Sequence, residues 1–184
     1  MDKQDSKGTE VSVQQREGEE AMNPIVQKIK ERFSDAFLGT YEFAGDLTIS
    51  VKKEKVFDIC RLLHDDTEMD FDYIIDICSV DYPEEEERFE VVYHFYSIKN
   101  RQRIRIKARV REDACTIDSV CDIWKGANFM EREVYDMMGI RFNNHPDLRR
   151  ILMTDDFEGY PLRKDFPVKG NGWRDRLDNL SEGY

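Results

Sequence analysis

The run EREVYDMMGIRFNNHPDLRRIL, residues 131–152, gathers the side chains of this sequence that are best suited to chemistry. Carboxylates at Glu131, Glu133 and Asp136 could exchange protons with a substrate, and His145 could act as a base. The sequence has no nucleophile elbow, phosphate-binding loop, dinucleotide fingerprint or His-Glu-x-x-His motif to accompany them. We therefore expect no catalytic residue in this chain.

The same charges have structural explanations if the run begins in a helix. Arg132 and Asp136 are four residues apart, so they could pair along the helix surface. Glu131 would lie in the first helical turn, where the helix dipole favours a carboxylate. From the residues alone, the sequence predicts an interaction domain without an active site of its own.

Residues that could bind a metal ion are scattered along the chain. The four cysteines include no Cys-x-x-Cys pair, and the three histidines are far apart. Zinc and iron–sulfur sites normally show clustered ligands in the sequence. We expect neither a metal site nor a cofactor bound by this chain.

The composition is that of one highly charged domain. Charged residues make up 36% of the 184 residues, and the net charge of -11 disfavours nucleic acid as a partner. No apolar run approaches the roughly 20 residues that a membrane helix needs. The start of the sequence has no apolar signal region, so we expect a cytoplasmic chain without a transmembrane segment.

We divide the chain into a disordered tail at residues 1–22, an α+β domain at residues 23–139 and a long extended arm at residues 140–184. The tail is polar and cannot bury enough apolar surface to order itself. The arm combines helix-breaking prolines and glycines with apolar residues such as Leu162 and Trp173. It could dock on a partner or wrap its own domain. We favour a partner, because long structureless loops are uncommon inside compact domains.

Caps and apolar periodicity predict the first half of the domain. Asn23 and Pro24 are suited to begin a helix, which Gly39 would end. The pattern continues with strand, turn and strand at 41–51, helical spacing at 52–66 and a β-rich run at 71–82.

Two more helices are predicted at residues 117–125 and 128–138, separated at Gly126. Asn128 would cap the second helix and Gly139 would end it. These elements together predict an α+β fold with a small mixed or antiparallel sheet packed with helices.

Residues 89–98 and 101–110 predict an antiparallel hairpin around the turn Lys99–Asn100. If Ile98 opposes Arg101, four apolar pairs fall on one face, as a hairpin over a core requires. The pairs are Phe95–Ile104, Tyr93–Ile106, Val91–Ala108 and Phe89–Val110.

Cations occupy the other face of this hairpin at alternate positions. Glu90 can pair with Arg109, whereas His94 and Tyr96 cannot neutralise their opposite arginines. The face could be an ordinary solvated surface, or it could dock on an acidic partner through complementary charge. Its cations are Arg101, Arg103, Arg105, Lys107, Arg109 and Arg111.

Two motifs, the run at residues 131–152 and GYPLRKDFP at 159–167, follow this hairpin in order. Together they resemble the 30-kDa family of respiratory complex I, the C subunits of the NADH–quinone oxidoreductases, over residues 24–170. The resemblance implies that the signature residues form a partner interface. They are Glu131, Arg132, Glu133, Asp136, His145, Arg149, Arg150, Tyr160, Pro161, Arg163, Lys164, Asp165, Phe166 and Pro167.

The resemblance also implies a non-catalytic core subunit in the peripheral arm, on the cytoplasmic face of the membrane. The implied neighbours are subunits D, B and I, and the FMN, iron–sulfur clusters and quinone belong to other subunits. The implied function is assembly and support of the quinone-reducing module. Electrons would pass from NADH to quinone in the complex, coupled to proton translocation.

Other readings remain open. Similar subunits occur in membrane-bound nickel–iron hydrogenases and ferredoxin-fed complexes, although the long GYPLRKDFP segment favours the quinone enzyme. An independent enzyme using Glu131, Glu133 or His145 is a second hypothesis. A free-standing adaptor that acts through the hairpin cations is a third.

Overall fold

The computed structural model of this chain describes residues 23–168. Within them, strands form a five-stranded sheet and a separate two-stranded one. The elements are α1 (Pro24–Arg32), β1 (Phe37–Phe43), β2 (Asp46–Val51), the short 3-10 helix η1 (Lys53–Lys55), α2 (Val56–Asp65), β3 (Tyr73–Asp81), β4 (Phe89–Ser97), β5 (Gln102–Val110), β6 (Thr116–Asp118), α3 (Ala127–Met138) and β7 (Arg141–Asn143). The main sheet has the order β1-β2-β5-β4-β3, with β2 and β5 parallel and the other neighbours antiparallel. This confirms the α+β class and the mixed sheet.

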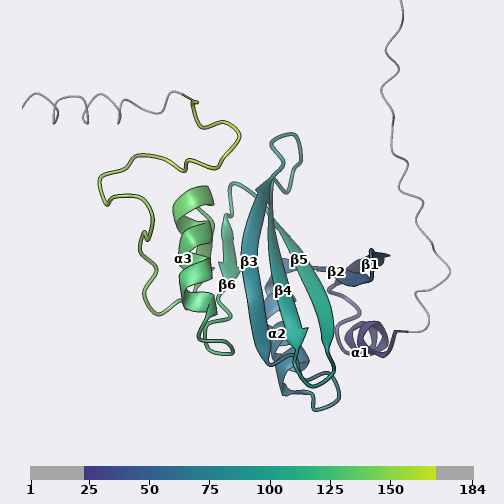
Figure 1. Cartoon of the computed structure of the whole chain (residues 1–184). Coiled ribbons are helices and arrows are strands. Elements are labelled where there is room, and N and C mark those ends of the chain that lie inside the picture. Colours follow the sequence, from purple (N-terminus) through teal and green to yellow (C-terminus); the bar gives the residue numbers. More distant parts are fainter. Residues whose placement is uncertain (1–22, 169–184) are drawn as a thin grey trace, which may run out of the picture.

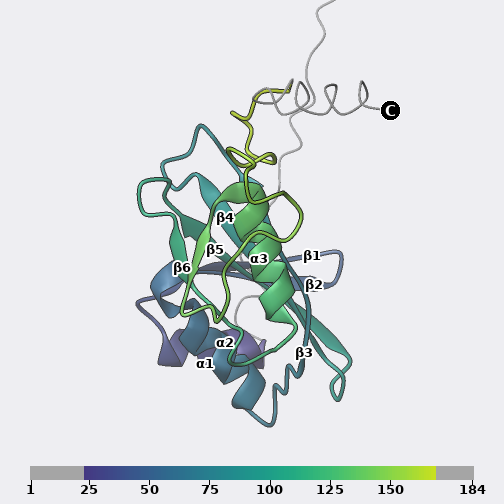
Figure 2. The same cartoon turned by 90° about the vertical axis from the view of Figure 1, so that its left-hand side faces the viewer.

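The main sheet has one apolar face and one charged face. Helices α1 and α2 pack on the apolar face, where Ile29, Ile59 and Leu63 join the inward residues of β4 and β5 in one core (Figure 1). Helix α3 lies beside β3, at the other end of the sheet from β1 (Figures 1 and 2). Among residues 23–168, no helix is long and apolar enough to cross a membrane.

Helix α1 begins as predicted but ends earlier. Asn23 Oδ1 accepts the Ile25 N–H at 3.0 Å, and Pro24 occupies the first turn. Gly39 is not the C-cap, because the helix already ends at Phe33 and Gly39 lies in β1. The pairing of β1 with β2 takes up the backbone of this segment, so the cap prediction was wrong.

The predicted β4–β5 hairpin forms in the predicted register. All four apolar pairs, from Phe95–Ile104 to Phe89–Val110, are cross-strand partners, and all eight side chains are buried. The strand–turn–strand at 41–51 is confirmed as well, with Ala44 and Gly45 both at positive φ in the turn.

Residues 117–125 do not form the predicted helix. Thr116–Asp118 pairs in parallel with β7 as β6, and the Ser119 N–H donates to Asn143 O at 2.9 Å. Backbone groups that a helix would use are therefore taken by a distant strand. Asn128 is not the cap of α3, which begins at Ala127 after Gly126. The predicted end at Gly139 is confirmed, with φ 79°.

The chain after Gly139 remains part of the domain. Ile140 and Phe142 are buried in the core and β7 pairs with β6, so no domain boundary follows Gly139. The described part of the predicted arm wraps its own domain instead of extending from it, because its arginines and aspartates find partners there. The predicted tail at residues 1–22 and the end of the predicted arm, with Trp173, lie outside the described residues.

Gly139 makes this return of the chain possible. A Cβ here would lie 2.5 Å from Tyr160 and 2.7 Å from Arg163, in addition to the strain of a positive φ. We expect Gly139→Ala to lower the free energy of unfolding by about 2–4 kcal/mol, measured by urea denaturation. Gly45→Ala, at φ +84° with open space around it, should lower the free energy of unfolding by only about 1–2 kcal/mol, the cost of the backbone strain alone. Equal losses would show that the contact with Tyr160 and Arg163 is unimportant.

Candidate functional site

The buried carboxylate of Asp136 on α3 holds the segment that follows β7. Its Oδ2 accepts three successive backbone N–H groups, from Ile151 (3.0 Å), Leu152 (2.7 Å) and Met153 (2.8 Å). Its Oδ1 accepts from Arg150 at 2.7 Å. Burial by itself raises the pKa of Asp136, but the hydrogen bonds outweigh it and lower this pKa below its ordinary value. We call this group of residues the Asp136 cluster.

Arg150 extends the Asp136 cluster to the second motif. Its guanidinium donates to Gly159 O at 3.1 Å and lies 5.8 Å from the Phe157 ring centre and 5.6 Å from that of Tyr160. One arginine therefore joins the carboxylate of α3 to two turns of the following segment.

Arg132 does not pair with Asp136, so the predicted pair along the helix surface was wrong. Its guanidinium donates to the carbonyl oxygens of Arg149 (3.1 Å) and Arg150 (3.0 Å). Asp136 is buried and its oxygens are taken by closer donors. Arg132 therefore helps to fix the same segment from outside.

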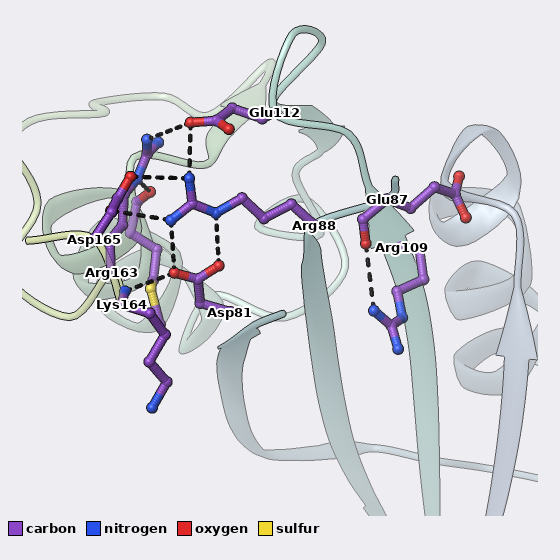
Figure 3. A network of polar contacts seen from close by, with 9 residues as sticks. Asp81, Glu87, Arg88, Arg109, Glu112, Arg163, Lys164 and Asp165 are labelled. Carbon is purple, nitrogen blue, oxygen red and sulfur yellow. Dashed lines mark hydrogen bonds and ion pairs between the residues drawn. The ribbon is translucent and has the colours of Figure 1, made fainter. Parts of the chain in front are cut away.

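A second cluster, the Arg88 cluster, holds the GYPLRKDFP motif (Figure 3). Arg88 donates twice to Asp81, at 2.7 and 2.9 Å, and contacts Glu112 and Asp165 at 3.0 Å each. Asp81 also accepts the backbone N–H of Lys164 at 2.7 Å. Hydrogen bonds from Arg88 lower the pKa of Asp81 and of Asp165 below their ordinary values.

Arg163 joins the Arg88 cluster to the end of α3. It donates to Met138 O at 2.7 Å and pairs with Glu112 at 3.2 Å. Its guanidinium lies 4.8 Å from the Phe89 ring centre and 4.6 Å from that of Tyr160. The signature residues Tyr160, Arg163, Lys164 and Asp165 are thus brought together on the surface of their own domain.

Sequence reasoning missed Asp81, Arg88 and Glu112. A weak signal was present, since Asp81 ends one apolar strand and Arg88 precedes the next, across the acidic loop. The partners of Arg88 are far along the chain, with Asp165 77 residues away. No local spacing points to such a contact.

Glu131 is fully buried and lies beyond the first turn of α3, so the helix-dipole explanation was wrong. Its carboxyl group accepts the Val120 N–H at 2.7 Å and lies 3.3 Å from Cys121 Sγ, which donates to it. Burial raises the pKa of Glu131 to about 7. Glu131 thereby fixes the loop that leads into α3, whereas Glu133 is exposed.

His145 ties the chain after β7 to the start of α3. Its Nδ1 accepts the Asp147 N–H at 3.0 Å, which leaves Nε2 to donate to Asn128 O at 3.1 Å. Potential ligand atoms of His145, Glu131 and Cys121 lie within 4.8 Å of one another. All three side chains already make hydrogen bonds, which a metal ion would have to displace. This arrangement does not test whether a metal binds, and the expected absence of a metal stays a prediction.

A second group that could hold a metal lies on the charged face of the sheet. It comprises Asp76, Cys78 and His94, also within 4.8 Å. Arg105 donates to His94 Nε2 at 2.9 Å, and its positive charge opposes a second cation there.

The basic face of the hairpin is partly neutralised within the chain. Glu90 pairs with Arg109 at 3.0 Å, as predicted, and also with Lys107 at 2.9 Å. Asp46 on β2 reaches Arg105 at 3.6 Å, a partner that sequence reasoning missed because β2 comes from an earlier part of the chain.

Apolar side chains project from the segments that the two clusters hold. Leu152 is 61% exposed and Leu162 57% exposed, and Ile151 is exposed too. Phe129, on α3, is a further exposed apolar residue. Asp136 holds the backbone N–H groups of Ile151 and Leu152, and Met137 O accepts that of Leu162. These four residues, which we call the apolar patch, are candidates for contact with another protein.

Glu131 gives unfolding a specific pH dependence. Between its ordinary pKa near 4.5 and its folded value of about 7, only the folded state keeps the proton. The free energy of unfolding should therefore fall as pH rises through this window, by on the order of 3 kcal/mol. Glu131→Gln should remove this slope in urea titrations from pH 4.5 to 8, whereas Glu133→Gln should keep it. An unchanged slope in Glu131→Gln would refute the assignment.

The Asp136 cluster should control the stability of the following segment. Asp136→Asn leaves Arg150 without its buried anion, so we expect a loss of about 3–5 kcal/mol and faster trypsin cleavage at Arg149 and Arg150, detected by mass spectrometry. The control Asp147→Asn breaks only an exposed pair with Arg149 and should change stability by less than about 1 kcal/mol. Similar behaviour of the two variants would contradict the role given to Asp136.

Comparison with solved structures finds relatives of the same fold. The trypsin-resistant fragment (1–134) of Nqo5 is 30% identical with a TM-score of 0.58, and the match covers 66% of this chain and 97% of that one. A chain of the membrane-bound sulfane sulfur reductase, an archaeal respiratory membrane complex, is 28% identical with a TM-score of 0.66. That match covers 87% of this chain and 89% of the other.

Comparison of sequences identifies the family. The NADH-quinone oxidoreductase C subunit of Geobacter sulfurreducens is 52% identical over 80% of this chain and 91% of its own length. The same subunit of Roseiflexus sp. is 46% identical over 78% of this chain and 83% of its own length. Residues 49–172 match the family model of the 30-kDa subunit of respiratory-chain NADH dehydrogenase. The chain therefore belongs to this 30-kDa family, the C subunits of the NADH–quinone oxidoreductases, as its motifs indicated.

Proposed function

We propose that this chain is a non-catalytic core subunit of the peripheral arm of NADH–quinone oxidoreductase. It supports assembly of the complex and of its quinone-reducing module, while the complex passes electrons from NADH to quinone and translocates protons. The observation that carries the proposal is the apolar patch, presented by segments that the Asp136 and Arg88 clusters hold in place.

Two of the carboxylates that could do acid–base chemistry, Glu131 and Asp136, make structural contacts instead, which supports a non-catalytic role. Asp136 pairs with Arg150 and accepts hydrogen bonds from the backbone N–H groups around it, and Glu131 is buried. A fixed segment loses little conformational entropy on binding. Leu152 and Leu162, exposed on such a segment, therefore suit a stable interface whose centre is apolar.

Subunits D, B and I are the proposed neighbours, on the cytoplasmic face of the membrane. FMN, the iron–sulfur clusters and quinone would be bound by other subunits. High identity to curated C subunits over most of the chain supports this assignment.

A second candidate is the corresponding subunit of a membrane-bound nickel–iron hydrogenase or a ferredoxin-fed complex. The likeness to a chain of the membrane-bound sulfane sulfur reductase shows that chains of this fold also occur in respiratory membrane complexes with other names, which leaves room for this candidate. That chain is 28% identical, against 52% for the Geobacter sulfurreducens protein, so we place the quinone enzyme first.

Purification of the tagged chain from gently solubilised membranes, followed by mass spectrometry, tests the proposal. We expect subunits B, D and I, flavin- and NADH-binding subunits and membrane subunits to be recovered with it. Recovery of a hydrogenase or ferredoxin-fed set would support the second candidate. A chain that is recovered alone would overturn both.

The apolar patch should be needed for assembly and not for folding. We expect Leu152→Glu combined with Leu162→Glu to reduce recovery of other subunits at least about tenfold, because each charge would be buried without a partner. The thermal midpoint of the isolated chain should stay within about 2 °C, since both leucines are exposed.

The matched control for the apolar patch is Leu38→Glu. Leu38 is 54% exposed on β1, at the far end of the main sheet, and we expect its substitution to leave recovery unchanged. Normal recovery with the double variant, or an equal loss with the control, would contradict the role of the patch.

A further inference from the structure

The cations on the charged face of the main sheet divide into two groups. Lys107 and Arg109 share the carboxylate of Glu90, whose side chain is almost completely buried. Arg101 and Arg103, nearer the turn of the β4–β5 hairpin, make no ion pair with any residue from 23 to 168. The positive charge that remains available is therefore concentrated at the turn end of the hairpin, the lower end in Figure 1.

Aromatic side chains accompany the unpaired Arg103. Cross-strand pairing places Tyr73, Tyr96 and Arg103 in one row across β3, β4 and β5. Their strand neighbours Ile74 and Phe95 point into the core, so the row lies on the open face. Tyr73 is 54% exposed.

A hollow of about 240 Å³ adjoins this row. Asp46, Ile75, His94, Arg103 and Arg105 are among the residues that line it. It has two guanidinium groups and one carboxylate, and its apolar border at Ile75 is exposed. The hollow therefore combines cationic and apolar surface, with the carboxylate of Asp76 close to His94.

The guanidinium groups in the hollow have unused capacity to donate hydrogen bonds. Arg105 is held by His94 at 2.9 Å and Thr48 at 3.1 Å, but its nearest carboxylate, on Asp46, is 3.6 Å away. His94 Nε2 accepts from Arg105, so the ring proton lies on Nδ1, a buried atom with no acceptor among the described residues. Burial lowers the pKa of His94, so the imidazole is neutral at pH 7 and the charge comes from the arginines.

The turn beside the hollow is fixed. Asn100 Nδ2 donates to the carbonyl oxygens of Glu68 at 2.8 Å and Met69 at 2.9 Å, and Lys99 Nζ donates to Thr67 O at 2.8 Å. Arg101 and Arg103 therefore start from an ordered backbone, which limits the entropy lost when a partner binds.

We propose that this hollow and the Tyr73–Tyr96–Arg103 row form a second docking surface, which receives an acidic segment of a neighbouring subunit. A carboxylate of that segment pairs with Arg103, whose planar guanidinium fits it in bidentate geometry. Apolar parts of the segment pack on Tyr73 and Ile75. The proposal rests on the proposed function, because the partner is another subunit of the complex.

Charge favours an acidic protein segment over the other possible occupants. A membrane surface rich in anionic lipid would face a broad area of a chain of net charge -11, whereas an acidic segment meets only the local cations. A phosphate group would bring more negative charge close to Asp46 and Asp76 than a single carboxylate does. A basic segment would meet the unpaired Arg101 and Arg103.

Site-specific photo-crosslinking in the native complex tests this surface. Benzoylphenylalanine replaces Tyr96 in the tagged chain, the purified complex is irradiated, and the joined peptides are sequenced by mass spectrometry. We expect an adduct with a segment of another subunit in which Asp and Glu outnumber Lys and Arg. No adduct, an adduct with lipid, or an adduct with a neutral or basic segment would overturn the proposal.

Charge reversal shows whether Arg103 determines the contact. Arg103→Glu should lower the crosslinking yield at least about tenfold, because the substitution places a negative charge opposite the partner's carboxylate. In the Arg103→Glu variant, replacing the crosslinked acidic residue of the other subunit by Lys should restore the yield. Arg61→Glu, the same change on the exposed side of α2, should leave it unchanged. An unaffected yield in Arg103→Glu would overturn the proposal.

The two proposals fail in different ways. If the tagged chain brings no other subunit out of the membrane, the proposed function fails. If the complex is recovered but the probe at Tyr96 finds no acidic segment, only the second docking surface fails.

Discussion

The carboxylate of Asp136 is the interaction on which the C-terminal part of this chain depends. It is buried on α3, and a buried charge is tolerated only when it is paired and hydrogen-bonded. Three successive amides and Arg150 meet that requirement. Because these donors come from residues 150–153, satisfying one carboxylate also fixes the path of the chain. The side chains of Ile151 and Leu152 are then left facing outward.

The Arg88 cluster repeats this arrangement with the charges exchanged. Here a nearly buried guanidinium gathers carboxylates, and Asp81 accepts an amide of the second motif. Arg163 and Gly139 connect the two clusters, since the glycine leaves room for the arginine to reach the end of α3. A segment without regular secondary structure thus acquires a defined surface. That surface carries the exposed leucines, which suits a protein whose proposed task is to bind other subunits.

The charged face of the main sheet shows the opposite use of arginine. Glu90 neutralises two cations in the middle of the face, whereas Arg103 near the turn has no ion-pair partner within residues 23–168. Charges that are satisfied inside the chain stabilise the sheet, and those that are not remain available to a partner. In a strongly acidic protein, this asymmetry leaves unpaired positive charge at one end of the sheet.

The sequence by itself determined the features that depend on close neighbours in the chain. The start of α1 at Asn23, the register of the β4–β5 hairpin and the end of α3 at Gly139 follow from caps and from alternation. The family could also be inferred, because its two motifs are continuous. Only the tertiary structure decided that Thr116–Asp118 is a strand, because its partner β7 is distant. It also decided that Asp136 pairs with Arg150 instead of Arg132 and that Arg88 recruits Asp165. The physical reason is that a buried charge takes the best donors that folding brings to it, and the spacing of residues along the chain does not specify which those are.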